Sequence, residues 1–159
     1  MSIRSFSKSS RKKGLTIIEL IVVVTIIGLM AAIAIPAYTQ SRQSSIATRT
    51  ANDFRKFAEQ FNHYALQNGT WPEDGLPTTV PSGMEPYLSD SVWPKETPVG
   101  GYWDYDFAAF GFTAGVSIDA TTLGDSVLQA IDGLMDDGNL STGIMIKTDG
   151  NRLSYILEQ

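Results

Sequence analysis

One stretch near the start of this chain constrains its structure more than any other feature. Residues 15–35, LTIIELIVVVTIIGLMAAIAI, contain a single charged side chain, Glu19. A helix of about 21 residues is roughly 30 Å long, which is enough to cross the apolar core of a bilayer. The sequence therefore predicts a transmembrane helix over residues 15–35 and one further domain formed by residues 36–159.

Charge is distributed unevenly around this stretch. The segment before Gly14 carries basic side chains and no acidic ones, whereas the whole chain has a net charge of −5. Basic residues stay on the cytoplasmic side of a membrane helix, so we expect a cytoplasmic N-terminus and an extracytoplasmic domain. The acidic remainder gives no electrostatic reason to bind nucleic acid. The basic residues of the segment are Arg4, Lys8, Arg11, Lys12 and Lys13.

Two ordinary interpretations of the apolar stretch fit incompletely. A secretory signal peptide has a shorter apolar core and a small-residue cleavage site, which the sequence around Pro36 matches poorly. A plain signal anchor explains the length and the basic flank but leaves Glu19 unexplained, because a carboxylate in lipid is costly and usually faces a partner. Cleavage between Gly14 and Leu15 would expose an α-amino group that could pair with Glu19 of another chain.

The segment from Arg11 to Tyr38 contains KKGLTIIELIVVVTIIGLMAAIAIPAY and resembles the leader and N-terminal helix of type IV pilins and type II secretion pseudopilins. It joins a basic stretch, a glycine at the cleavage position, a glutamate at the fifth mature position and a proline after the apolar run. The resemblance implies that residues 1–14 form a leader peptide, which a prepilin peptidase removes after Gly14. It also implies a filament subunit that polymerises through its N-terminal helix.

The resemblance assigns roles to individual residues. Leu15 would become the N-methylated mature N-terminus, where the family more often has phenylalanine. Glu19 would correspond to the glutamate that guides subunit assembly. Gly28 and Pro36 match positions at which the helix could loosen as subunits leave the lipid. Both also have a mechanical explanation, since glycine costs a helix about 1 kcal/mol and proline removes a hydrogen bond, and Pro36 also suits the membrane exit.

The sequence of the domain predicts an α+β fold. Apolar residues recur every three or four positions over 37–67, which indicates an amphipathic helix that ends at Asn68-Gly69. Six of the seven prolines lie in 70–98, which predicts an irregular loop. A short helix is expected over 121–137, capped by Thr121 or Thr122. Strands are expected at 100–107, 112–120, 143–148 and 152–157, the last two around the turn Asp149-Gly150-Asn151.

The expected architecture is therefore pilin-like: a long N-terminal helix, with a transmembrane half and an amphipathic half, packed on a small antiparallel β-sheet with one extra short helix. No catalytic pattern is visible, because the chain has no cysteine and a single histidine, His63, without a nucleophile pattern around it. We predict that the protein is not an enzyme and needs no cofactor.

Calcium is the one ion that the resemblance brings in, since major pseudopilins commonly bind it through carboxylates and carbonyls of a C-terminal loop. That loop pattern is not cleanly reproduced in this chain, so no metal ligand is assigned. The acidic residues that could contribute are Asp104, Asp106, Asp119, Asp132, Asp136, Asp137 and Asp149.

The leading interpretation is a pseudopilin, a structural subunit of a type II secretion pseudopilus that supports protein export. The short chain, the missing cysteine pair and the Trp-Pro-rich loop favour it over a type IV pilin for adhesion, motility or DNA uptake. A membrane-tethered binding module that does not polymerise, with 70–98 as its binding loop, is the alternative of another class. The expected partners are prepilin peptidase, other copies of the chain and related pilins in a helical filament, the inner-membrane assembly platform, and membrane lipid before assembly. The expected location is the inner (cytoplasmic) membrane as a single-pass protein, and then the filament.

Overall fold

A computed structural model describes residues 14–88 and 92–159, so the expected leader lies outside the described residues except for Gly14. The chain divides after Thr39 into an N-terminal unit and a compact unit formed by residues 40–159. Its elements are α1 (Ile17–Asn68), α2 (Glu85–Leu88), β1 (Tyr102–Phe107), β2 (Ala114–Asp119), α3 (Asp125–Met135), β3 (Met145–Lys147) and β4 (Leu153–Glu158).

Helix α1 is unbroken from Ile17 to Asn68 and contains Pro36. The predicted long N-terminal helix, with its transmembrane and amphipathic halves, is therefore confirmed, and it continues through the proline. Its C-terminal end is the predicted one: Gly69 adopts a φ of 71°, and its N–H donates to the carbonyl of Ala65 at 2.8 Å. Among the described residues, α1 is the one helix that is long and apolar enough to cross a membrane.

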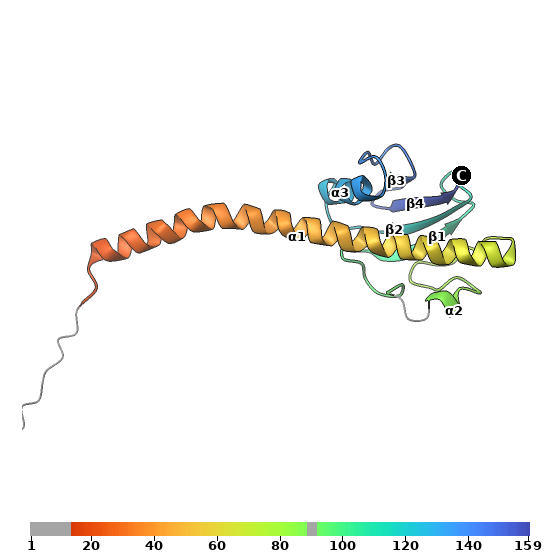
Figure 1. The fold of residues 1–159 in the computed structure, drawn as a ribbon, viewed down its shortest axis with the longest axis horizontal. Helices are drawn as coiled ribbons and strands as arrows, with labels where there is room; N and C mark the ends of the chain where they lie inside the picture. Colours follow the sequence, from red (N-terminus) through yellow and green to blue (C-terminus); the bar gives the residue numbers. More distant parts are fainter. Residues whose placement is uncertain (1–13, 89–91) are drawn as a thin grey trace, which may run out of the picture. The chain divides into compact units, whose positions relative to one another are not determined.

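The four strands form one antiparallel sheet in the order β1-β2-β4-β3 (Figure 1). The four predicted strands are confirmed, β1 pairs with β2 and β3 with β4, and β2 and β4 pair to join the two hairpins, with Val116 opposite Tyr155. Helix α3 lies between β2 and β3 in the sequence and is the predicted extra short helix. The fold is therefore the expected α+β arrangement.

The core of the compact unit lies between the second half of α1 and one face of the sheet, along which this part of the helix runs in Figure 1. Three phenylalanines of α1 contact the aromatic residues of β1. The ring of Phe57 lies 4.7 Å from that of Trp103, and the ring of Phe61 stacks on Tyr105 at 4.4 Å. Phe54 meets Trp103 edge-on at 4.8 Å. Burial of these large rings fixes the register between the amphipathic half of α1 and the sheet.

The predicted cap of α3 is wrong. The helix begins after Gly124, which makes no side-chain capping bond. The hydroxyl of Thr121 instead donates to the carbonyl of Asn151 at 2.7 Å, and the backbone N–H of Thr122 donates to the carbonyl of Val99 at 3.0 Å. These two threonines tie the chain to neighbouring loops before the helix starts, which the local sequence could not reveal.

Candidate functional site

The start of α1 is organised by a reciprocal pair of side chains. The backbone N–H of Thr16 donates to Oε2 of Glu19 at 2.8 Å, and the Thr16 hydroxyl donates to the same oxygen at 2.7 Å. The N–H of Glu19 points back to the Thr16 hydroxyl oxygen at 3.3 Å. This is a capping box, in which a threonine before the helix and a glutamate three residues later satisfy the unpaired N–H groups of the first turn.

The capping box gives Glu19 a function within its own chain that the sequence interpretation missed. The signal was present as Thr-x-x-Glu immediately before an apolar run. Both bonds use Oε2, and Oε1 of Glu19 has no hydrogen-bond partner among the described residues. The carboxylate is therefore held in one position while its second oxygen remains able to accept a bond from outside the chain.

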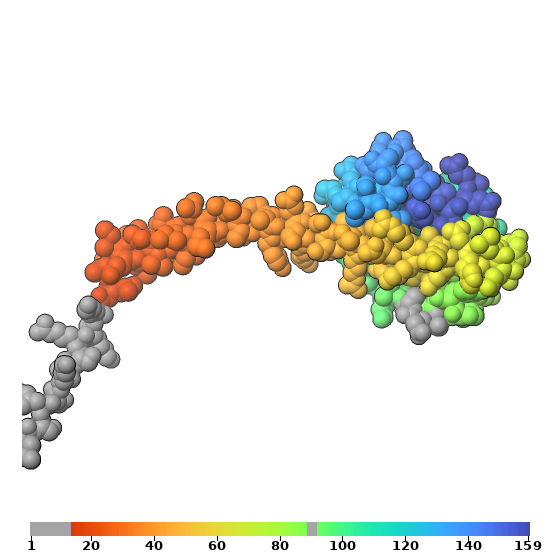
Figure 2. Space-filling view, viewed as in Figure 1, coloured from red at the N-terminus to blue at the C-terminus, as the bar shows by residue number. Residues whose placement is uncertain are grey.

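The side chains around this carboxylate are apolar and exposed. Leu15 is 77% exposed and Ile17 is 79% exposed. The large apolar residues that follow them, up to Ile35, are also exposed, and Figure 2 shows this part of α1 in red to orange. Of the described residues from 14 to 35, none is buried. A continuous apolar surface of this extent is unusual in a water-soluble protein and indicates contact with lipid or with other proteins.

The other predicted residues of this segment have simple surroundings. Gly14 precedes the helix and is exposed. Gly28 has open space where a side chain would stand, so no neighbouring group within the described chain requires a glycine there. Pro36 lies inside α1, where its carbonyl accepts a bond from the hydroxyl of Thr39 at 2.8 Å. Loosening of the helix between Gly28 and Pro36 stays a prediction.

Three of the seven acidic residues considered for calcium meet an arginine instead. Arg152 Nη1 lies 2.8 Å from Asp104 and 2.8 Å from Asp106, and its Nη2 lies 3.2 Å from Asp119. The hydroxyl of Ser117 also donates to Asp106. Because Asp104, Asp106 and Arg152 are almost completely shielded from water, this cluster is a structural ion-pair network in which three carboxylates share one guanidinium.

The network makes stability depend on pH in a defined direction. Burial raises the pKa of Asp104 to about 6, against the opposing effect of its bond with Arg152. Because the folded state binds this proton more tightly than the unfolded state does, protonation of Asp104 stabilises the fold at pH values below the unfolded pKa. This stabilisation is lost as the pH rises through about 6. We therefore expect Asp104→Asn to gain stability relative to the natural chain as the pH rises from 4 to 7, by on the order of 2 kcal/mol.

Urea unfolding of the full chain in detergent, followed by tryptophan fluorescence, measures this difference. Asp149→Asn is the matched control, because Asp149 is an exposed turn residue that takes no part in the Arg152 ion pairs. A constant difference between Asp104→Asn and the natural chain across this pH range would contradict the assignment.

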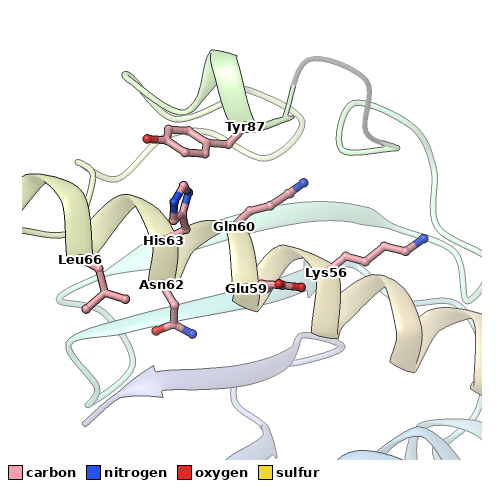
Figure 3. Close-up of a pocket in the computed structure, with 7 residues that line it drawn as sticks. All are labelled: Lys56, Glu59, Gln60, Asn62, His63, Leu66 and Tyr87. Atoms are coloured by element: carbon pink, nitrogen blue, oxygen red, sulfur yellow. The ribbon is translucent and has the colours of Figure 1, made fainter.

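A surface pocket lies along α1 beside the loop that follows it, and Figure 3 shows its lining residues. The single histidine of the chain, His63, belongs to it, and its ring lies 5.5 Å from that of Tyr87. Nε2 of His63 lies 3.2 Å from the Gln67 side-chain amide. The histidine thus contacts an amide and an aromatic ring. The lining residues are Lys56, Glu59, Gln60, Asn62, His63, Leu66 and Tyr87.

Comparison with known proteins identifies similar chains of two kinds. A family model described as a prokaryotic N-terminal methylation motif matches residues 9–35. The type IV major pilin protein PilE of Neisseria gonorrhoeae is 38% identical over 74 residues, which cover 45% of this chain and 42% of that pilin. The chain thus spans less than half the length of this relative, and the similarity is concentrated in part of the molecule.

Two other relatives align over most of the chain. The fimbrial protein EcpC of Eikenella corrodens is 28% identical over 130 residues, covering 82% of this chain and 80% of that protein. The type II secretion system core protein G of Klebsiella pneumoniae is 26% identical over 145 residues, covering 84% of this chain and 97% of that protein.

Among solved structures, the major type IV pilin PilA1 from Clostridium difficile has a similar fold. It matches with a TM-score of 0.52 at 14% identity, covering 74% of this chain and 97% of that chain.

Proposed function

Because the chain belongs to the family of type IV pilins and type II secretion pseudopilins, we propose that it is a pseudopilin, a structural subunit of a type II secretion pseudopilus. A prepilin peptidase would cut it between Gly14 and Leu15, and the new N-terminus would be methylated. The subunit would then polymerise through residues 15–35 with copies of itself and related pilins, on an inner-membrane assembly platform, and support protein export.

The observation that carries the pseudopilin assignment is the extent of the alignment with core protein G. It covers 97% of that protein, whereas the higher identity to the Neisseria pilin is limited to 42% of the pilin. The absence of cysteine agrees with a domain that is held together by packing, hydrogen bonds and ion pairs. A type IV pilin is the second candidate, supported by the long alignment with EcpC.

The exposed apolar half of α1 supports the proposed mechanism. Before assembly this surface would lie in the lipid of the inner membrane, with the basic leader in the cytoplasm and residues 40–159 outside it. In the filament, the same surfaces of neighbouring subunits would cover one another. Contacts that repeat head to tail without closing generate an open helix, so one kind of interface suffices to build the whole filament.

Glu19 would select the position of each incoming subunit. Its Oε2 accepts bonds from Thr16 of its own chain, which leaves Oε1 for the α-amino group of a neighbouring Leu15. An ammonium group beside this oxygen would neutralise a carboxylate that is otherwise costly within apolar surroundings. Only cleavage after Gly14 creates this ammonium group.

A substitution at the cleavage position tests the processing step. We expect Gly14→Leu to accumulate as a membrane-inserted precursor that retains residues 1–14, because the apolar helix is unchanged while a bulky side chain replaces the small residue before the cut. Mass spectrometry of the membrane fraction measures this outcome. Gly28→Leu is the matched control, since it replaces a helical glycine that has open space around it and should leave cleavage normal. Normal cleavage of Gly14→Leu would refute the proposed cut.

Deletion of the gene separates the two filament types. Loss of a pseudopilin should leave exported proteins in the periplasm, with motility and DNA uptake unchanged. Loss of motility, adhesion or DNA uptake with normal secretion would favour the type IV pilin. Normal secretion, motility, adhesion and DNA uptake, together with protein that stays monomeric in the membrane, would favour a tethered binding module.

A further inference from the structure

The positive charges of the compact unit are concentrated on α1. Residues 40–159 contain sixteen acidic and seven basic side chains, and so have a net charge of −9. Four of the seven cations lie on α1. Arg152 is buried in its aspartate network, and Lys147 pairs with Asp125 at 2.7 Å. The remaining cation, Lys95, lies in the loop before β1. An acidic domain therefore presents most of its positive charge on one helix.

Three of these cations form a basic stripe along the helix. Arg42, Arg49 and Lys56 follow one another at intervals of seven residues, and His63 continues the same spacing. Seven residues are close to two turns of an α-helix, so each step returns to nearly the same side with a drift of about 20°. All four side chains are exposed. The basic stripe thus runs along the side of α1 that faces away from the core.

The charges of the basic stripe are not neutralised by the rest of the unit. Among the described residues, neither Arg42 nor Arg49 makes an ion pair. Lys56 lies 3.7 Å from Asp53, but its side chain stays 71% exposed, and an exposed pair at this distance contributes little. The fourth cation of α1, Arg55, is engaged instead, because it donates to a backbone carbonyl of α3. The stripe is therefore available to a partner.

A surface hollow lies beside the middle of the basic stripe. Arg49 and Lys56 line it together with hydroxyl and amide groups. Guanidinium, ammonium and hydroxyl groups are the donors that a carboxylate binds, so the hollow suits an acidic side chain of another molecule. The other lining residues are Ser44, Ser45, Thr48, Asn52, the buried Asp53 and Val92.

The opposite charge is exposed beyond the far end of the helix. The loop after α1 and the end of β4 carry a distal acidic patch, which consists of Glu73, Asp74 and Glu158, all exposed. Trp71 ties the two segments together, since its indole N–H donates to Glu158. Burial, and then the charges of acidic groups led by Asp74 and including Glu158, raise the pKa of Tyr105, so both carboxylates act on the same region. None of the ion pairs among the described residues involves this patch.

The basic stripe and the distal acidic patch lie at different places on the compact unit. The patch begins beyond Asn68, about 20–30 Å of helix past Lys56 and Arg49. A contact between them therefore joins unlike surfaces of two copies rather than the same surface twice. Contacts of this kind can repeat without closing and then build an open helix.

We propose that the basic stripe of one subunit docks on the distal acidic patch of a second copy of the chain, outside the membrane. The contact presupposes the proposed filament and adds a charged interface to the apolar one of residues 15–35. A second copy fits, because every copy carries both surfaces and the apolar half of the same helix supplies the association that opposite charges then orient.

Other anionic partners fit the basic stripe less well. A net charge of −9 on the unit opposes binding to the phosphates of nucleic acid. From Arg42 to Lys56 the stripe extends about 20 Å along a helix that would cross the membrane, whereas the headgroup layer of a bilayer is only roughly 5–8 Å thick. Anionic lipid could therefore reach one end of the stripe but not its length.

Charge reversal in the full chain, expressed in the native organism in place of the natural chain, tests the contact. Arg42→Glu with Arg49→Glu should lower incorporation into sheared filaments about tenfold, because repulsion replaces attraction. Glu73→Lys with Asp74→Lys should do the same from the other side. All four changes together exchange the charges of the two surfaces and should restore incorporation to within about threefold of the natural chain.

Two single reversals are the matched controls. Lys95→Glu and Asp149→Lys reverse exposed charges outside the basic stripe and the distal acidic patch, so both variants should enter filaments as the natural chain does. The Tm of each purified variant checks that its fold is intact.

A pair of cysteines tests the contact without relying on filaments. The chain has no cysteine, so introduced thiols are the only ones present. In membranes, Arg49→Cys and Asp74→Cys chains expressed together should form dimers with a short bifunctional maleimide, whereas each alone should stay monomeric. One chain that carries both changes should form ladders. Raising the salt from about 0.05 to 0.5 M should lower the yield, because salt screens exposed charges.

The outcomes separate the contact from the proposed function. Normal incorporation of either reversed chain, or no recovery in the fourfold exchange, overturns the contact while the filament stands. Cross-links without filaments in the native organism retain the contact and refute the proposed function, and absence of both refutes both. If no cross-link forms and the natural chain binds DNA or phosphatidylglycerol vesicles more tightly than Arg42→Glu with Arg49→Glu, the second copy is the wrong occupant.

Discussion

Arg152→Ala should lower the free energy of unfolding of the compact unit by about 3–5 kcal/mol, the usual cost of removing one partner from a buried ion pair. Arg152 is the counter-charge for Asp104 and Asp106, which lie two residues apart on the same face of β1. Without the guanidinium, two carboxylates would stay buried side by side. Since small domains are stable by only about 5–15 kcal/mol, this loss is a large share of the total.

Urea unfolding at pH 7, followed by the fluorescence of the buried Trp93 and Trp103, measures the effect. Adding Asp104→Asn and Asp106→Asn to Arg152→Ala should restore much of the stability, because the stranded charges are removed with their partner. The loss should also shrink at pH 4, because the raised pKa values of Asp104 and Asp106 leave these carboxyl groups largely protonated in the folded state, and no buried charge is then stranded. A loss below about 1 kcal/mol at pH 7 would show that the network is not a structural element of the fold.

Glu19→Gln should reduce incorporation into filaments at least about tenfold while membrane insertion stays normal. Glutamine can still accept the hydrogen bonds from Thr16, so the helix cap is retained and only the negative charge is lost. A tenfold loss of incorporation corresponds to about 1.4 kcal/mol. The loss of the pairing between Glu19 and a neighbouring ammonium group should cost at least this much. The measurement compares the subunit in sheared filaments with the subunit in carbonate-washed membranes.

Thr16→Ala is the matched control for Glu19→Gln. It removes the hydroxyl from the capping box at a cost of about 1 kcal/mol to the first turn, but it keeps the charge of Glu19. Incorporation should stay within about twofold of the natural chain. The opposite pattern, with Thr16→Ala excluded from filaments and Glu19→Gln incorporated, would show that assembly depends on the helix cap rather than on the charge.

Local sequence patterns predicted the long helix, the four strands and α3, but not the short helix α2, which lies in the stretch expected to be an irregular loop. Alternation in 100–107 and 112–120 predicted β1 and β2, and Asp149-Gly150-Asn151 predicted the turn between β3 and β4. The three-to-four-residue spacing of Phe54, Phe57 and Phe61 predicted the face of α1 that packs on the sheet. These features depend on neighbours within a few residues, where periodicity and turn chemistry carry the information.

Features that depend on distant residues were not predictable in the same way. Alternation placed Asp104 and Asp106 on one face of a strand, but their partner Arg152 lies more than forty residues later and is brought near through the β2–β4 pairing. The capping box was visible in the sequence and was missed because the carboxylate was interpreted through partners outside its own chain.

Residues 15–35 should become an assembly element only after the leader is removed. The most direct measurement is the intact mass of the protein isolated from sheared surface or pseudopilus filaments of the native organism. We expect a chain that begins at Leu15 and carries one added methyl group. A filament-bound chain that still begins at Met1, or a processed chain found only as a monomer in the membrane, would contradict it.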